Sequence, residues 1–394
     1  MRVKLGNPVS GADFWPRAEI VEDLFNALVN DQGSRRLFGL RRIGKTSVLM
    51  ELQRRLIERP ELTVIRMDVQ GVSRFKDFLG KVFEQIHADD RRVKIKKVLS
   101  SNPVAQSLLS AAWSRIAGTA APVAPISFVN EFEHRTAWEG GIEDALREAG
   151  PVVLIIDELP FMLRNMLNDD YKPRDVERFL ATLRSWRMNA GVRMLLSGSL
   201  GLAQIKRTHG VHVADHIGDL FPERLPPLSR QEALALVDAL AAGEKLDDWT
   251  SAQSMAVVDA SAELWPIFLQ YGFSAAAKSP ARDPALVTLA VNASVRQSLD
   301  ETFYQQFTER LSRYGHDEKP ARAMLKAVAA ASPQSTSFEA FDKALRAIGA
   351  LDRRDDLLEA LREDDLLLFD TDAQWAWPAS KLVPIWVRSR AWGR

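Results

Sequence analysis

The stretch that decides the fold spans residues 39–46 and reads Gly39-Leu40-Arg41-Arg42-Ile43-Gly44-Lys45-Thr46. It matches the pattern G-x-x-x-x-G-K-[ST] at every fixed position. Glycines let such a loop curl so that successive backbone amides point at phosphate oxygens. The following helix adds the positive end of its dipole, the Lys45 ammonium reaches the β- and γ-phosphates, and the Thr46 hydroxyl binds Mg²⁺. The loop therefore predicts a P-loop NTPase that binds a nucleotide and magnesium.

An apolar run that ends in two carboxylates lies further along the chain. Residues 152–158 read Val-Val-Leu-Ile-Ile-Asp-Glu, a pattern typical of a central parallel strand buried on both faces. We expect Asp157 to hold the magnesium ion, because ligands of open parallel sheets gather at the carboxyl ends of the strands. Glu158 is expected to polarise a water molecule towards the γ-phosphate. This strand supplies the catalytic carboxylates that the phosphate loop requires.

A third strand, over residues 192–196, ends in two hydroxyl groups around a glycine, in the order Ser197-Gly198-Ser199. Either serine could donate a hydrogen bond to the γ-phosphate or to the attacking water. A simple turn after a strand explains the same residues equally well. The sequence therefore leaves the roles of Ser197 and Ser199 open.

The order of the predicted elements divides the chain into three parts. Strands at 63–69, 152–156 and 192–196 alternate with helices at 46–58 and 75–86, which predicts an α/β parallel sheet with helices on both faces. After residue 228 the pattern becomes helical. Residues 317–394 give helices at 320–331, 338–348 and 353–363 and then a hairpin at 366–377, which is a winged-helix pattern. We expect a core over 1–228, an all-α segment over 229–316 and a winged-helix-like domain over 317–394.

Composition limits the classes of function. The 394 residues include 52 basic and 52 acidic side chains, so a basic field over the whole molecule is absent. The absence of cysteine excludes disulfides, thiolate zinc sites and a cysteine nucleophile. The N-terminus lacks the apolar core of a signal peptide, and the longest apolar runs are too short to span a bilayer. We expect a cytoplasmic protein that does not enter a membrane.

Taken in this order, the motifs resemble those of the archaeal-type ATPases of the STAND class, which have an AAA+-like P-loop core. Residues 14–20, Phe-Trp-Pro-Arg-Ala-Glu-Ile, resemble the N-terminal F-x-G-R-x-x-E-[IL] box of this family. Residues 39–46, 152–158 and 196–199 resemble its Walker A loop, Walker B strand and sensor strand. Residues 222–233 resemble the entry into its helical lid, which corresponds to 229–316, and the tail resembles its winged helix.

The resemblance implies that the nucleotide is ATP, that Mg²⁺ accompanies it, and that the chain is an ATP hydrolase. The residues that it implies for nucleotide binding are Gly39, Leu40, Arg41, Arg42, Ile43, Gly44, Lys45, Thr46, Ser47, Arg17 and Pro266. The residues that it implies for catalysis are Lys45, Glu158, Ser197 and Ser199, and for metal binding Thr46 and Asp157. The sequence departs from the family at Pro16, which replaces a glycine, and at 264–266, where a G-x-P motif lacks its glycine. Both boxes would line the adenine side.

The winged helix raises the question of a DNA partner. Its third helix and the turn after it, residues 353–365, contain three basic and six acidic residues, and phosphates would repel such a helix. The basic segment 91–97 and the basic residues of the last turn are possible phosphate contacts, but a solvated face explains them better. Trp375, Trp377, Trp386 and Trp392 indicate either an interface or internal packing. We expect an unidentified protein partner rather than DNA.

Three functions compete at this point. The first is an ATPase switch, whose hydrolysis resets a conformation that the C-terminal domain reads. The second is a DNA-acting ATPase of the initiator or transposition-regulator type, which shares the same domain order. The third is a nucleotide-bound scaffold without hydrolysis, against which the intact Glu158 argues. In an oligomer, Arg184 or Arg187 would be candidates for an arginine that acts on the neighbouring subunit, with an exposed helix face as the alternative.

Overall fold

The protein is described here from a computed structural model. The structure describes residues 2–15, 17–75, 77–79, 81–82, 142–144, 146–147, 150–169, 171–199, 205, 209–278 and 283–390. The basic segment 91–97, Pro16 and Trp392 lie outside these residues, and the predicted helix over 75–86 lies only partly within them.

A five-stranded parallel sheet forms the core, with strand order β2-β3-β4-β1-β5. The strands are β1 (Arg35–Phe38), β2 (Thr63–Asp68), β3 (Val152–Asp157), β4 (Arg193–Gly198) and β5 (Phe221–Glu223). Every residue of β3 is buried, as its apolar run predicts. Phe38 is paired with Gly198, and Asp68 with Asp157, so four strands end at one edge of the sheet. The P-loop, the two carboxylates and the serine turn all follow these strand ends.

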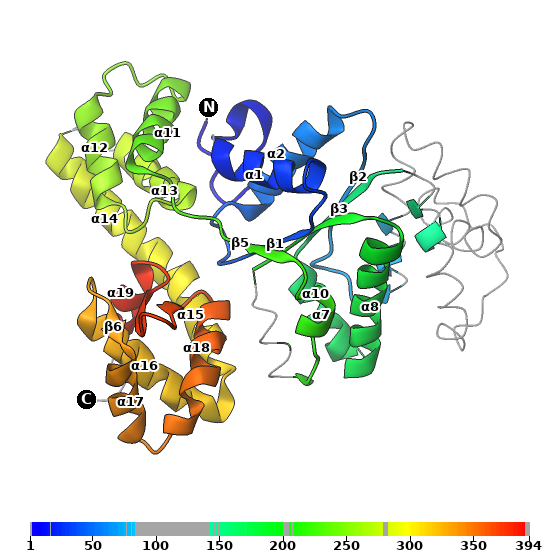
Figure 1. Cartoon of the computed structure of the whole chain (residues 1–394). Helices are drawn as coiled ribbons and strands as arrows, with labels where there is room; N and C mark the ends of the chain where they lie inside the picture. Colours follow the sequence, from blue (N-terminus) through cyan, green and yellow to red (C-terminus); the bar gives the residue numbers. More distant parts are fainter. Residues whose placement is uncertain are drawn as a thin grey trace.

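Helices cover both faces of the sheet (Figure 1). On one face lie α1 (Ala18–Val29) and α2 (Lys45–Ile57), and on the other lie α7 (Leu159–Asp169), α8 (Pro173–Asn189) and the short α10 (Ala214–Ile217). Alternate residues of β3 belong to different apolar clusters: Val153 and Ile155 pack with α1 and α2, whereas Leu154 and Ile156 pack with α7 and α8. The predicted α/β core is therefore confirmed.

A helical segment follows the core at the position expected for the lid, and we call it the lid below. It consists of α11 (Arg230–Gly243), α12 (Ser251–Ala260), α13 (Pro266–Ala277) and α14 (Pro284–Ser298). A capping box begins α11, because the Ser229 hydroxyl accepts from the Glu232 amide and the Glu232 carboxylate accepts from the Ser229 amide. The π-helical turn Leu299–Tyr304 and helix α15 (Gln305–Ser312) connect the lid to the C-terminal domain.

The C-terminal domain contains the predicted three helices and hairpin. The helices are α16 (Glu318–Ala331), α17 (Phe338–Arg346) and α18 (Arg354–Glu363), and the hairpin consists of β7 (Leu367–Asp370) and β8 (Trp375–Pro378). The structure adds a short strand β6 (Thr336–Ser337), which pairs with β8, and a last helix α19 (Leu382–Ser389). Short 3-10 turns lie at Gly11–Asp13, Gly315–Asp317 and Leu351–Arg353. The domain is winged-helix-like.

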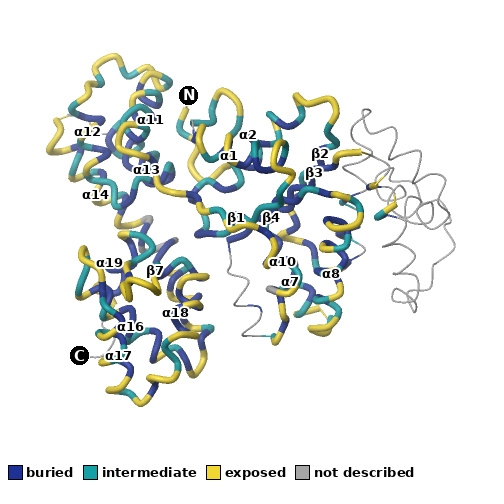
Figure 2. The backbone as a smooth tube through the Cα atoms, viewed as in Figure 1, coloured by how far each residue is buried: buried dark blue, intermediate teal, exposed yellow. Residues whose placement is uncertain are grey.

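The three parts share one core. A single cluster of buried apolar residues contains Leu37 of β1, Leu236 of the lid and Leu325 of α16, and Figure 2 shows buried backbone in all three parts. Among the described residues, no helix is both long enough and apolar enough to cross a membrane.

Candidate nucleotide site

The phosphate loop joins β1 to α2. Gly44 has a φ of 106° and caps the N-terminus of α2, a conformation that glycine adopts without strain. The side chains of Leu40 and Ile43 are buried in the core, so these two residues anchor the loop and present only backbone to a ligand. Gly39 is closely packed, because a Cβ there would lie 3.1 Å from Ile43 Cδ1 and 3.4 Å from Asp365 Oδ2.

Lys45 opens α2 and is 5% exposed. Its Nζ donates to the carbonyl oxygens of Gly39, at 3.1 Å, and of Leu40, at 2.6 Å. Burial lowers the pKa of Lys45 to about 8, while the carboxylates of Glu158 and Asp157 oppose that shift. The ammonium thus lies in a dry site, where charge attraction is strong.

The two residues expected to bind metal are in contact. Thr46 Oγ1 donates to Asp157 Oδ2 at 2.8 Å, and Asp157 is 1% exposed. The described residues include no group of three or more His, Asp or Glu side chains that could hold a metal by themselves. A hydroxyl and one carboxylate nevertheless suit Mg²⁺, which keeps several waters and is completed by substrate phosphates.

Glu158 has a φ of 61°, a left-handed conformation that is uncommon for this residue type. Its Oε2 accepts from both the backbone amide and the hydroxyl of Ser199, each at 2.9 Å. Gly198 is required beside it, because a Cβ there would lie 2.4 Å from Pro160 Cδ. The structure therefore brings Ser199 to Glu158. Ser197 is fully buried within β4, and its Oγ has no hydrogen-bond partner among the described residues.

A cavity of about 480 Å³ lies beside the loop. Its lining includes Arg41, Arg42, Gly44, Lys45, Thr46, Ser47 and Glu158. Apolar residues also line it, among them Val9, Leu236, Leu240, Pro266 and Ile267, together with polar residues such as Asp13 and Gln270. This is the arrangement expected of a nucleotide site, with polar groups for phosphates and an apolar wall for a base.

Arg17 also lines this cavity. It is 7% exposed, and its Nε, Nη1 and Nη2 atoms have no hydrogen-bond partner among the described residues. Burial lowers its pKa to about 10, although the charge of Glu232 opposes the shift. A buried guanidinium without a partner is costly, which favours an anionic ligand for this site.

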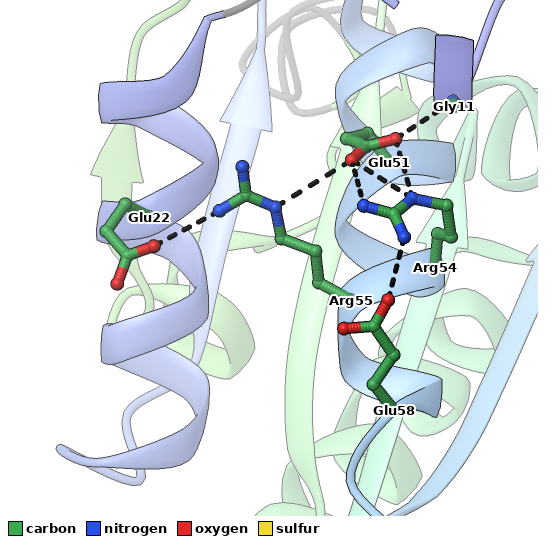
Figure 3. Close-up of polar contacts among 6 residues, drawn as sticks. All are labelled: Gly11, Glu22, Glu51, Arg54, Arg55 and Glu58. Atoms are coloured by element: carbon green, nitrogen blue, oxygen red, sulfur yellow. Dashed lines mark hydrogen bonds and ion pairs between the residues drawn. The ribbon is translucent and has the colours of Figure 1, made fainter.

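The N-terminal segment covers the cavity, and sequence reasoning missed it. The Val9 amide donates to Ser47 Oγ at 3.1 Å, and the Gly11 amide donates to Glu51 Oε2 at 3.0 Å. Figure 3 shows how Arg54 and Arg55 in turn hold Glu51 on α2. Glu51 is buried, and the hydrogen bond from Arg54 lowers its pKa despite that burial. Nothing in residues 2–9 has a periodicity that would have indicated this position.

The apolar wall was missed for a different reason. Leu236 and Leu240 are spaced four apart on α11, and Ile267 follows Pro266 at the start of α13. The i, i+4 spacing signals one helix face, but the same spacing equally predicts packing inside the lid.

The two arginines ahead of the sensor strand have partners within the chain. Arg187 donates to both carboxylate oxygens of Asp219, with 3% of its side chain exposed. Arg184 Nη1 donates to the Asp215 carbonyl at 2.5 Å. The interpretation of this stretch as an exposed helix face is wrong for Arg187, which is a buried structural residue.

Comparisons with known proteins agree with the fold. Among solved structures, a Walker-type ATPase of Pyrococcus abyssi superposes with a TM-score of 0.61 at 16% identity, covering 98% of this chain and 100% of that chain. The ORC2 protein of Aeropyrum pernix gives 0.48 at 12% identity, with coverages of 97% and 96%. Cdc6p of Pyrobaculum aerophilum gives 0.39 at 11%, with coverages of 96% and 97%. At 16% identity, the Pyrococcus abyssi structure shows a likeness of fold alone. No curated protein matches the chain.

The family comparison concerns the part of the chain that carries the site. Residues 29–205 match the family described as an AAA domain. The matched stretch contains the phosphate loop, Asp157, Glu158, Ser197 and Ser199. Residues 29–205 are therefore an AAA domain of the P-loop ATPase type.

Proposed function

We propose that the chain binds ATP with Mg²⁺, hydrolyses it, and uses the nucleotide to switch its conformation, as in the STAND class. The observation that supports this best is one continuous chain of hydrogen bonds. It runs from Thr46 to Asp157 Oδ2, from the Glu158 amide to Asp157 Oδ1 at 3.1 Å, and from Ser199 to Glu158 Oε2. Three separate segments thus meet beside Lys45, at the end of the cavity that suits phosphates.

Each side chain has a role in this proposal. Lys45 neutralises the β- and γ-phosphates, and the loop amides from residue 42 to Ser47 bind their oxygens. Glu158 takes a proton from the attacking water, and Ser199 orients that carboxylate. Arg17 meets negative charge on the nucleotide, because it is a buried cation without a hydrogen-bond partner among the described residues.

Thr46 and Asp157 are the residues that would hold the magnesium ion. When bound, Mg²⁺ offsets the charge that develops on the phosphate oxygens during transfer. Asp157 is already oriented for this task, because each of its carboxylate oxygens accepts one hydrogen bond.

The base would lie on the apolar side of the cavity. Pro266 and Ile267 at the start of α13, and Leu236 and Leu240 on α11, belong to the lid. A nucleotide would therefore contact the core through its phosphates and the lid through its base. Loss of the γ-phosphate would change the contacts to the core and leave those to the lid. This difference supports a nucleotide-dependent change in the position of the lid relative to the core.

The partner is proposed to be a protein rather than DNA. Three arginines lie in α18, the third helix of the winged-helix-like domain, or in the turn before it, and each is paired with a carboxylate. Arg353 pairs with Asp317, Arg354 with Asp342 and Asp355, and Arg362 with Glu359. These pairs leave little cationic surface for a phosphate backbone. Trp386 is fully buried, and its ring centroid lies 5.2 Å from that of Phe307. Trp375 and Trp377 are instead 44% and 39% exposed. The two exposed tryptophans are the better candidates for a protein contact.

One experiment tests the proposal directly. ATP binding is measured by calorimetry with and without Mg²⁺, and ADP formation is followed by chromatography on the same sample. We expect ATP to bind more tightly with Mg²⁺ than without it, and we expect ADP to accumulate slowly. A protein that binds ATP and forms no ADP would be the scaffold instead.

A further inference from the structure

A buried phenylalanine next to Glu158 carries two arginines. Phe161 lies in the first turn of α7, and its amide donates to the carbonyl oxygen of Glu158 at 3.0 Å. Cζ of Arg41, in the phosphate loop, lies 4.6 Å from the centroid of the Phe161 ring, and Cζ of Arg164 lies 4.5 Å from it. Stacking on a ring holds a guanidinium in place without using its N–H donors. Both side chains therefore keep their donors for a ligand.

Acids do not neutralise these two guanidiniums. Among the described residues, no carboxylate forms an ion pair or a hydrogen bond with the side chain of Arg41 or Arg164. Burial lowers the pKa of Arg164, and the charges of Arg313 and Arg41 lower it further, whereas the charge of Glu309 opposes the shift. Three arginine side chains thus gather beside α7, and the carboxylate of Glu309 can neutralise at most one of them.

Helix α15 supplies a further donor. The amide of Arg41 donates to Gln306 Oε1 at 2.9 Å, which fixes this point of the phosphate loop against α15. Nε2 of the same side chain is buried and has no hydrogen-bond acceptor among the described residues. Gln306 and Arg313 are seven positions apart at the end of α15, so they lie on one face of the helix. The side chains of Arg41, Arg164 and Gln306 all present N–H donors, and such a group of donors suits an oxyanion.

Arg41 joins this group of donors to the nucleotide cavity. It lines the cavity, as do Lys45 and Glu158, whereas Arg164 does not. In the proposed function Glu158 activates the water that attacks the γ-phosphorus, so inorganic phosphate forms between the phosphate loop and Glu158. Phosphate that leaves its place beside Lys45 would meet Arg41 and, across the ring of Phe161, Arg164.

We propose that Arg41, Arg164 and Arg313 form a binding site for the inorganic phosphate that hydrolysis releases, apart from the place where ATP holds its γ-phosphate. The inference rests on the proposed function, because that reaction supplies the ligand. Water adds to the γ-phosphorus, the bond to the bridging oxygen of ADP breaks, and the phosphate leaves with the oxygen of water. Arginine forks bind phosphate oxygens in pairs, which suits a compact ion with four oxygens. A nucleic-acid strand suits the site less, because it needs cations spaced along its backbone.

The test measures phosphate binding to the full chain by calorimetry. Saturating ADP and Mg²⁺ fill the nucleotide cavity, inorganic phosphate is the titrant, and potassium chloride keeps the ionic strength constant. Arg164→Gln and Arg313→Gln each remove one charge from outside the cavity. Arg59→Gln is the matched control, because Arg59 Cζ also lies over a phenylalanine ring, that of Phe25 at 5.6 Å, and Arg59 does not line the cavity. Thermal unfolding of each variant shows that it is folded.

We expect the dissociation constant for phosphate to rise by about tenfold or more in Arg164→Gln and in Arg313→Gln, the size of one lost charge-assisted contact. The affinity for ADP should stay within about twofold in both, because neither residue lines the cavity. Arg164→Lys keeps the charge but loses the planar fork, so its phosphate affinity should lie between those of the parent and Arg164→Gln. Arg59→Gln should bind phosphate and ADP as the parent does.

Product inhibition gives a second readout. The phosphate concentration that halves the rate of ADP formation should rise by a similar factor in Arg164→Gln, and it should not change in Arg59→Gln. Each variant is compared with its own rate in the absence of phosphate, so a change in basal turnover does not enter the comparison.

Unchanged phosphate affinity in folded Arg164→Gln and Arg313→Gln proteins would overturn the inference, as would a parent that binds no phosphate when loaded with ADP. A glutamate-rich peptide that binds more tightly than phosphate, and loses affinity in the same two variants, would assign the arginines to a protein partner instead. All three results leave the proposed function standing, because they concern phosphate binding alone. A parent that forms no ADP from ATP would end both proposals, and ADP formation is measured on the same sample.

Discussion

Thr46 Oγ1 donates a 2.8 Å hydrogen bond to Asp157 Oδ2, although 111 positions separate the two residues in the chain. The contact joins the phosphate loop to the neighbouring acidic strand end. It places a hydroxyl and a carboxylate together, and both are oxygen ligands of the kind that Mg²⁺ takes. The two residues that distant motifs predict to bind a hard cation thus lie together at one edge of the sheet.

Removing the carboxylate should therefore uncouple nucleotide binding from magnesium. We expect Asp157→Asn to lower the gain in ATP affinity that Mg²⁺ provides by about tenfold or more, because an amide is a weaker ligand than a carboxylate. Calorimetric titrations with and without Mg²⁺ measure this gain. If Asp157→Asn retains the full gain, the metal is held elsewhere.

Lys45 should make ATP binding depend on pH. Its pKa is lowered to about 8 without nucleotide, so the ammonium is charged below pH 8 and increasingly neutral above it. Phosphate affinity should then be highest near neutral pH and fall as the pH rises through about 8 to 9. Lys45→Met should bind ATP at least about tenfold more weakly at pH 7. Its affinity should also change less with pH, and a parallel slope in both proteins would assign the titration to another group.

Arg17 should strengthen ATP binding without stabilising the nucleotide-free protein. Its guanidinium is buried without a hydrogen-bond partner among the described residues, so Arg17→Met should leave the nucleotide-free protein as stable as the parent or more stable. ATP affinity should fall by about tenfold, because a charge-assisted contact is lost.

Arg187→Met provides the matched control for that prediction. Arg187 is also buried, but it is paired with Asp219. Its removal should lower the melting temperature and leave ATP affinity unchanged. Thermal unfolding and calorimetry of the two variants should thus give opposite patterns, and a destabilised Arg17→Met protein with normal ATP affinity would assign Arg17 to the fold.

The C-terminal domain should not make the chain a strong DNA binder. The arginines of α18 and its N-terminal turn are already paired with carboxylates. We expect the full chain to bind duplex DNA no better than the non-specific range, about 10⁻⁴–10⁻⁶ M at physiological salt. The full chain is the right sample, because its lid and C-terminal domain share an apolar core. Submicromolar, salt-sensitive binding would instead favour the DNA-acting ATPase.

Local patterns predicted the core of the site and the order of the elements. A phosphate loop and a strand that ends in Asp157 and Glu158 are each encoded within a few residues, because the backbone and side-chain groups that define each motif are neighbours in the chain. The parallel sheet and the winged-helix-like tail follow from hydrophobic periodicity in the same way, although this reasoning missed the short strand β5. These features required no knowledge of long-range contacts.

Contacts between distant segments could not be predicted. Three features depend on how distant parts of the chain pack against one another. They are the hydrogen bond from the Val9 amide to Ser47, the hydrogen bond from Arg310 to the Ser199 carbonyl, and the burial of Asp364. Charge counting failed for the same reason, since it treated Asp364 and Asp365 as exposed when they face the core. Likewise, the choice between Ser197 and Ser199 depends on which hydroxyl reaches Glu158, and alternation along β4 alone does not decide it.

The most direct test of the account is the steady-state rate of ADP formation by Glu158→Gln, measured with Mg²⁺ beside the parent. Glutamine keeps the shape of Glu158 but cannot accept a proton, so turnover should fall by about 10²–10⁴-fold while ATP affinity stays within about twofold. Calorimetry on the same preparations supplies the affinity. A Glu158→Gln protein that hydrolyses ATP at the parent rate would contradict the assignment of Glu158 as the base and, with it, the hydrolytic mechanism proposed here.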